Sequence, residues 1–381
     1  MNKLILFAYP FRIFFLSLAI WAIAVVALWI CSVTRLLPLE FALPALRWHQ
    51  HEMLFAILNP AIAGFLLTAV CVWTNTERLH GLPLILLWLV WAIGRLLTAL
   101  PLVPEVMMIA INLLFLPLVM IDAGRRIISA KQPRHAPILL VLFLLWTAQA
   151  AFLLQWSEHA IAMALIAASA LMLIVGGRIT PAFSGNWLRA NGGDPERISN
   201  PLWLERLTLA AMLALCVTLP LGIQMLTATL ALLAAAISFS RIALWRGWLT
   251  WREPMLWILH LSLLWIPVGL LLLAGSRFDL WPENVWIHAI GIGAMSALIF
   301  GVITRVSLGH TGRPLKLPDG MVSAFVLIHA SALIRILTAL QIFPWQRGIE
   351  ITAALWVGAW LLFLMRYSMI LLRPRVDGRP G

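Results

Sequence analysis

The stretch RWHQHEMLFAILNPAIAGFLLTAVCVW, residues 47–73, places two histidines and a glutamate at the start of a long apolar run. From Gln50 to Trp73 the run reaches the ~20 residues with which a helix crosses the hydrocarbon core of a bilayer. A segment in lipid must pair its backbone groups internally, and a helix does so. We therefore predict a transmembrane helix over residues 50–73 that begins with ionisable side chains.

Similar apolar runs recur along nearly the whole chain. Of the 381 residues, 62% are hydrophobic and 11% are charged, whereas a soluble domain carries roughly a quarter charged residues. The composition indicates an all-α polytopic membrane protein with about twelve transmembrane helices in a single transmembrane domain, residues 1–381. The predicted helices cover residues 11–33, 50–73, 82–101, 104–121, 136–154, 159–179, 205–221, 224–245, 254–274, 285–304, 319–341 and 348–371.

Lysine and arginine are unevenly distributed between the predicted loops. The loops after the fourth, sixth, eighth and tenth helices and the C-terminal tail are basic, whereas the loops after the third, fifth and seventh have no lysine or arginine. The positive-inside tendency therefore places both termini in the cytoplasm. The net charge of +12 reflects this topology. Nucleic-acid binding is not expected, because no soluble domain is present to carry it.

Two pairs of predicted helices share short patterns. His51 precedes Gly64 by 13 residues, as His288 precedes Gly301, and the segments GRLLTAL and IRILTAL contain Arg95 and Arg335. These similarities suggest three parallel four-helix units, a kind of duplication known in membrane proteins. The alternative is that helices rich in leucine and alanine resemble one another by composition alone.

Ionisable side chains inside a membrane are costly, so each one is a candidate for function. The predicted topology places His51 and His288 near the outer ends of their helices, with Arg95 and Arg335 at a similar depth. Imidazole can ligate a metal and guanidinium can pair with an anion. Haem uses both, as iron ligand and as partner of its propionates. Because the chain has no C-x-x-C-H motif, any haem is expected to be non-covalent, and copper would also accept imidazole.

Two neighbours of His51 have open roles. In a helix His49 would point to nearly the opposite face from His51, whereas in an extended segment the two rings would share a face. His49 is therefore a ligand of the same metal, a ligand of another metal, or a neighbour of the site. Glu52 either orients an imidazole through its N–H or favours the helix N-terminus as an acidic residue.

A second group of candidates lies toward the predicted cytoplasmic side. It comprises His260, Arg178, Arg305, His310 and Arg313, the last two in the segment GHTGRP. These side chains suit a second haem, its propionates or another anion, with His260 as a further metal ligand. The alternative is that the arginines at helix ends anchor the protein at the interface by snorkelling.

Several segments of the chain resemble those of the NnrS family. They are FRIFFLSLAIWA, WHQHEMLFAILNPAIAGFLLTAV, GGRITPAF, LHLSLLWIPVGL, HAIGIGAMSALIFGVITRVSLGHTGRPL and ALIRIL, in the family's order. The segments WHQHEM and RVSLGHTGRPL are the most specific. By this resemblance the family's motifs fall on His49, His51, Glu52, Arg95, Arg178, His260, His288, Arg305, His310 and Arg313.

The resemblance implies a bacterial inner-membrane protein that contains haem and copper and that responds to, or protects from, nitric oxide. The implied cofactor is a b-type haem, and the implied ligand is nitric oxide or another small diatomic molecule. Proteins of respiration or denitrification are the implied partners. The sequence does not distinguish catalysis from sensing or protection. The alternatives are a twelve-helix transporter of a small anion or solute and an assembly factor for respiratory enzymes.

Overall fold

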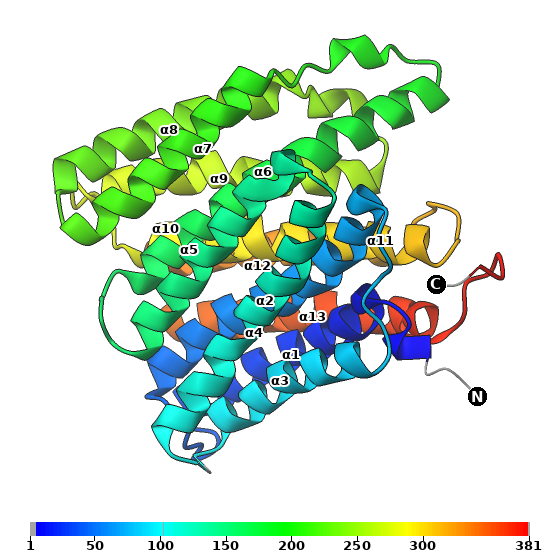
Figure 1. The fold of residues 1–381 in the computed structure, drawn as a ribbon. Helices are drawn as coiled ribbons and strands as arrows, with labels where there is room; N and C mark the ends of the chain where they lie inside the picture. Colours follow the sequence, from blue (N-terminus) through cyan, green and yellow to red (C-terminus); the bar gives the residue numbers. More distant parts are fainter. Residues whose placement is uncertain (1–4, 102, 380–381) are drawn as a thin grey trace. The chain divides into compact units, whose positions relative to one another are not determined.

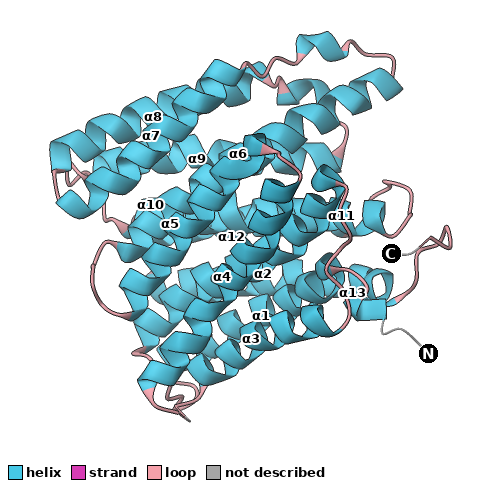
Figure 2. Ribbon diagram, viewed as in Figure 1, coloured by secondary structure: helices cyan, strands magenta, loops and turns pink. Residues whose placement is uncertain are grey.

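The computed structural model describes residues 5–101 and 103–379 of the chain. These residues form helices and no strand (Figure 2). Twelve helices within the described ranges are long and apolar enough to cross a membrane. The predicted class, an all-α polytopic membrane protein, is confirmed. The last two residues of the basic C-terminal tail lie outside the described ranges.

The helices follow one another in the order shown in Figure 1. The first six spans are α1 (Pro10–Val33), α2 (Ala45–Thr74), α3 (Leu82–Ala99), α4 (Glu105–Ser129), α5 (Ala136–Leu153) and α6 (Ala160–Ala190). The next three are α7 (Leu202–Thr218), α8 (Gln224–Leu244) and α9 (Pro254–Ser276). The tenth span consists of α10 (Asn284–His288), the π-helical η6 (Ala289–Ser296) and α11 (Ala297–His310), and the last two are α12 (Met321–Ala339) and α13 (Trp345–Leu372).

Four spans are at least five residues longer at one end than the sequence predicts. α2 begins at Ala45 instead of residue 50, and α4 runs to Ser129 instead of residue 121. α6 runs to Ala190 instead of residue 179, and the tenth span runs to His310 instead of residue 304. The prediction ended α6 where glycine, proline and arginine become frequent, but the helix continues through Pro181. Arg178 therefore lies inside α6 and not at its end.

Two prolines inside the spans are accommodated by side chains of neighbouring helices. A proline in a helix leaves the carbonyl four residues earlier without its N–H donor. In α2, Pro60 leaves the carbonyl of Ala56, which accepts a hydrogen bond from Trp91 Nε1 at 3.2 Å. In α4, the carbonyl of Leu113, four residues before the internal proline, accepts from Trp146 Nε1 at 2.9 Å. These donors keep both helices unbroken in a medium that offers no water.

The same device explains the length of α6. Pro181 leaves the carbonyl of Gly177 without a backbone donor, and Asn200 Nδ2 donates to it at 2.8 Å. Because Asn200 stands just before α7, a residue outside the helix completes the hydrogen bonding within it. Sequence-based reasoning has no access to this partner.

The chain divides into two compact units. Unit 1 consists of Met1–Leu154, Ile303–Ala324 and Trp356–Gly381, and unit 2 of Gln155–Val302 and Phe325–Leu355. Both ends of the described chain belong to unit 1. Neither unit is a run of four consecutive spans, so the compact units do not coincide with the three four-helix units suggested by the sequence.

Each unit contains one helix that is buried almost all round. In unit 1, the apolar window of α2 is 83% buried, against 33% for α3 and α4, and in unit 2 that of α6 is 89% buried. α1 packs directly on α2, because a Cβ atom at Gly64 would lie 2.6 Å from the Phe15 ring. Polar side chains on α2 and α6 are therefore removed from lipid, and both helices carry buried polar networks.

Candidate functional site

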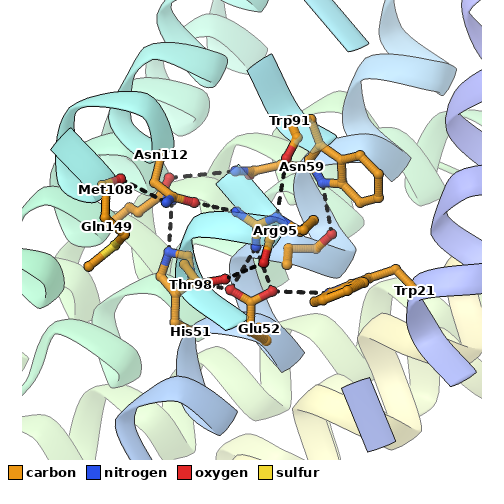
Figure 3. A network of polar contacts seen from close by, with 11 residues as sticks. Trp21, His51, Glu52, Asn59, Trp91, Arg95, Thr98, Met108, Asn112 and Gln149 are labelled. Atoms are coloured by element: carbon orange, nitrogen blue, oxygen red, sulfur yellow. Dashed lines mark hydrogen bonds and ion pairs between the residues drawn. The ribbon is translucent and has the colours of Figure 1, made fainter. Parts of the chain in front are cut away.

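Glu52 on α2 is fully buried and anchors a polar network within unit 1 (Figure 3). Its two carboxylate oxygens each accept a hydrogen bond from Arg95 Nη1 on α3 at 2.7 Å. Trp21 Nε1 on α1 donates to Oε2 at 3.0 Å. One carboxylate thus joins three helices of the unit.

The guanidinium of Arg95 is also held from its other side. Its Nη2 donates to Asn112 Oδ1 on α4, and Asn112 Nδ2 donates in turn to the Met108 carbonyl at 2.8 Å. A Cβ atom at Gly94 would lie 3.1 Å from Asn112 Oδ1, so the glycine beside Arg95 lets the amide approach. The sequence predicts that Arg95 partners a cofactor acid. In the structure its charge is neutralised by Glu52 inside the chain.

His51 is fully buried beside this ion pair, and its hydrogen bonds define its tautomer. Nδ1 lies 2.7 Å from Glu52 Oε1, and an ionised carboxylate only accepts, so Nδ1 carries the hydrogen. Nε2 then carries the lone pair, to which the Gln149 amide nitrogen donates at 3.2 Å. Metal-ligating histidines use this arrangement, with a carboxylate on one nitrogen and the metal on the other. Metal ligation by His51, which would require the Gln149 amide to leave Nε2, stays a prediction.

The two histidines at the start of α2 have different surroundings. Because α2 begins at Ala45, both residues are helical, and the extended alternative does not apply. His51 joins the Glu52 network, whereas the ring of His49 stacks on Trp29 with centroids 4.1 Å apart. Glu52 orients an imidazole, which is one of the two roles that the sequence suggests for it.

His288 in unit 2 has the same tautomer by a different route. Its Nδ1 lies 2.6 Å from the Asn284 carbonyl oxygen, which can only accept, so the lone pair is on Nε2. The residue ends α10 and directly precedes the π-helix η6. π-Helical turns are rare and often occur at functional sites. Joint ligation by His51 of unit 1 and His288 of unit 2 stays a prediction.

Arg335 on α12 lies in the segment IRILTAL, which resembles the segment GRLLTAL around Arg95. Within the described ranges Arg335 makes no hydrogen bond or ion pair, and its Nη1 is buried. It lies four residues before the end of α12. Its charge is therefore available to an anionic group, as the sequence predicts for a propionate partner.

A second buried ion-pair network connects α6, α7 and α8 in unit 2. Glu205 accepts from Arg178 Nη2 at 3.3 Å and from Arg241 Nη2 at 3.2 Å. The Arg178 side chain is 31% exposed, whereas that of Arg241 is 1% exposed. Arg241 Nη1 also donates to the Leu173 carbonyl at 2.9 Å, and its guanidinium lies directly against Gly177. Two guanidiniums share one carboxylate here, which leaves a positive charge.

Sequence reasoning named Arg178 but missed its partners. Arg241 stands alone in the apolar segment SFSRIAL, and an isolated arginine in a predicted span is a signal by itself. Asn112 and Gln149 were also missed, although each is a single amide in an apolar run, which is a signal of the same kind. Which side chain each one contacts depends on helix packing and is not readable from the sequence.

His260 on α9 is enclosed by α6 and by the segment that precedes α9. Its Nε2 lies 2.9 Å from Ser184 Oγ. Its Nδ1 is buried without a hydrogen-bond partner, and a Cβ atom at Gly247 would lie 2.6 Å from it. The 3-10 helix η5 (Gly247–Thr250) therefore covers this face of the ring. Metal ligation by His260 stays a prediction.

The remaining candidates lie at one end of unit 1. Arg305 is half-buried on α11. His310 ends α11, and its ring packs on Phe11 with centroids 5.6 Å apart. Its carbonyl accepts from Arg375 Nη1 at 3.0 Å, and Arg313 follows three residues later. In the structure this motif holds the C-terminal segment, while its predicted role toward a cofactor is not tested.

The donor set fits haem at some positions and not at others. The rings of His51 and His288 both carry their lone pair on Nε2, and Arg335 is open to a propionate. Arg95, by contrast, is already paired with a carboxylate. Among the described residues no group of three or more His, Cys, Asp or Glu side chains is arranged to hold a metal ion.

Comparison with known proteins gives the family. The family described as "NnrS protein" matches residues 5–375. No curated protein matches the chain. Since the family match covers nearly the whole chain and agrees with the resemblance seen in the sequence, this multi-pass membrane protein belongs to the NnrS family.

Proposed function

We propose that this protein binds a b-type haem in a bacterial inner membrane and, through it, nitric oxide. Membership of the NnrS family supports a role in the response to nitric oxide at the level of the family. The observation that carries the proposal is the tautomer of two histidines: His51 and His288 each donate Nδ1–H to a fixed acceptor, which places the lone pair that a metal would need on Nε2. Copper is the second metal to which imidazole would be suited.

The proposal assigns separate tasks to the chain's own residues. Glu52 holds the His51 ring. As an anion, it also makes the lone pair on His51 Nε2 more basic and so a stronger metal ligand. Arg95 keeps Glu52 ionised and in place, because a buried carboxylate needs a partner. Arg335 neutralises an acid of the cofactor. A bound haem would supply a coordination position at iron for nitric oxide.

The surroundings of the site suit a small apolar ligand. Nitric oxide is uncharged and enters lipid, so it needs no polar channel to reach a metal among helices. α2 is buried almost all round, and its polar groups are directed at one another within the network. Water is therefore excluded around Glu52, and a neutral diatomic ligand is favoured over a charged one.

Haem content of purified variants tests the ligand assignment. We expect the Soret band per folded protein to fall strongly in His51→Ala and in His288→Ala. His80→Ala is the matched control, because His80 is exposed and bonded only to Glu77. Monodispersity in size-exclusion chromatography separates loss of haem from loss of fold. Wild-type haem content in both His51→Ala and His288→Ala would refute the assignment.

The transporter alternative gains no support from the helix that suggested it. Asn59-Pro60 is the best candidate for a break in a span, but α2 is continuous there. Trp91 Nε1 donates a hydrogen bond to the Ala56 carbonyl, which lacks its backbone donor because of Pro60. Uptake of a labelled anion by proteoliposomes is the test of that alternative. Uptake by protein that contains no haem would favour it over the haem proposal.

A further inference from the structure

We propose that the basic end of unit 1 binds a phosphate-bearing anion through Arg313 and Arg373. The site lies where the start of α1, the turn after α11 and the end of α13 meet. It is separate from the Glu52 network and does not depend on haem. The charged residues that meet there include Arg12, Arg313, Arg373, Arg375 and Asp377.

Arg12 ties the first and last helices of the chain together. Its side chain is fully buried, and its Nη1 donates to the carbonyls of Leu371 at 2.6 Å and Arg373 at 2.8 Å. These carbonyls belong to the C-terminal end of α13, where a helix lacks internal donors and carries partial negative charge. The guanidinium of Arg12 is thereby fixed in position, pointing into the basic end.

Asp377 is the carboxylate of the cluster within the part of the chain that the structure describes, and it is already engaged. Asp377 accepts from Arg375 Nε at 2.9 Å and from Arg375 Nη2 at 2.6 Å, a two-bonded pair. The hydrogen bonds from Arg375 hold the pKa of Asp377 well below its usual range. The segment is fastened further by the Val376 backbone N–H, which donates to the Thr311 carbonyl at 3.2 Å. Asp377 therefore forms its side-chain ion pair with Arg375, and its Oδ1 also accepts from the Arg379 backbone N–H at 3.3 Å.

Arg313 is an arginine of this cluster that has no hydrogen-bond partner among the described residues. Its Nη1 is buried and makes no hydrogen bond among the described residues. Burial and the nearby charge of Arg373 both lower the pKa of Arg313. The charge of Arg313 also acts on Arg12. Like charges gathered around a buried donor require an anion for compensation.

Interfacial anchoring alone does not explain this arrangement. An anchoring arginine extends its head group toward water or lipid head groups and leaves its N–H groups exposed. Arg12 is instead 0% exposed, and one Nη of Arg313 is buried. Planar guanidiniums match the oxygens of phosphate. Basic pockets between transmembrane helices on the cytoplasmic side are suited to anionic head groups.

Lipid- and phosphate-dependent stability of the full chain in detergent tests the proposal. We expect phosphatidylglycerol to raise the thermal midpoint more than phosphatidylcholine does. In Arg313→Gln the half-saturating concentration should rise by roughly tenfold, the equivalent of losing one charged hydrogen bond. Arg252→Gln is the matched control, because it removes the same charge from an exposed residue of unit 2. Arg373→Gln is the second variant if Arg313→Gln does not fold.

Two further arms identify the source of the phosphate group. Saturable stabilisation by inorganic phosphate, at ionic strength matched with chloride, would support a site for free phosphate. Stabilisation by the lipid alone would support a headgroup site. The proposal is overturned if neither anion stabilises the wild-type protein, or if Arg252→Gln weakens the effect as much as Arg313→Gln does.

Discussion

Units 1 and 2 each carry an arginine in a similar sequence setting, but only one of the two arginines has a carboxylate partner. The residue after the second histidine of α2 is Glu52, and it neutralises Arg95. The residue after His288, near the start of the tenth span, is Ala289, which has no charge to offer. Arg335 makes no ion pair or hydrogen bond among the described residues. The two settings therefore differ at one position, where Glu52 pairs with Arg95 and Ala289 offers no charge to Arg335.

The difference in ion pairing indicates which of the two arginines can bind an anionic ligand. A buried charge that is paired inside the fold contributes to structure, whereas an unpaired one is costly until an anion arrives. Arg95 is therefore interpreted as a positioning residue for Glu52, and through it for His51. Arg335 is interpreted as the arginine that is open to an acid of a bound cofactor. The following predictions test this contrast, from the largest expected effect to the smallest.

The largest effect is expected from Glu52→Gln. The substitution leaves the buried charge of Arg95 without its carboxylate, and breaking such a pair costs about 3–5 kcal/mol in free energy of unfolding. Thermal or denaturant unfolding of the purified protein in detergent measures it. The double variant Glu52→Leu with Arg95→Met should be closer to wild type, because it removes both charges. A Glu52→Gln protein as stable as wild type would mean that the network is not a structural ion pair.

A smaller loss is expected from Glu205→Gln in unit 2. The substitution leaves two guanidiniums together, one of them buried, but Arg178 is partly exposed and can turn to water. We expect a loss of about 2 kcal/mol in free energy of unfolding. Adding Arg241→Gln to this variant should recover part of the loss. No recovery in the double variant would show that Glu205 and Arg241 are not coupled.

Arg335→Gln should separate stability from cofactor binding. Because Arg335 has no hydrogen-bond or ion-pair partner in residues 5–101 and 103–379, the substitution should leave the haem-free protein as stable as wild type or slightly more stable. Its haem affinity should fall by roughly tenfold, through loss of one charged hydrogen bond. Haem titration followed by absorbance measures the affinity. The comparison fails if Arg335→Gln destabilises the haem-free protein as much as Arg95→Gln does.

The smallest effect concerns the helix that carries the site. Trp91→Phe removes the donor to the Ala56 carbonyl and should cost about 1 kcal/mol in free energy of unfolding. The cost should shrink when Pro60→Ala is added, because the helix then regains its own backbone donor. A double-mutant cycle by thermal unfolding gives the coupling. Strictly additive effects would show that Trp91 does not compensate for Pro60.

Much of the fold could be read from the sequence, because span length is set by bilayer thickness and by backbone hydrogen bonding. The boundaries failed where tertiary partners override local signals. Pro181 suggested a loop, but Asn200 supplies the hydrogen bond that the proline removes, and α6 continues to Ala190. The repeat between Arg95 and Arg335 was visible as a pattern of letters, whereas the difference in their pairing was not inferred.

The candidate site was predictable in its ionisable members and not in their connections. His51 and Glu52 were identified because charged and metal-binding groups are rare in lipid. Asn112 and Gln149 were missed, since an amide in an apolar run names no partner until the helices are packed. Arg95 was expected to meet a cofactor acid, but the structure pairs it with Glu52. Helix packing, which one sequence does not state, decides between these outcomes.

The most direct test of the proposed function is a titration of the purified wild-type protein with nitric oxide, followed by absorption spectroscopy and combined with iron and copper analysis. The account predicts bound iron, a Soret band that shifts on addition of nitric oxide, and the same shift in His80→Ala. Protein that folds with no iron and shows no spectral change with nitric oxide would contradict it.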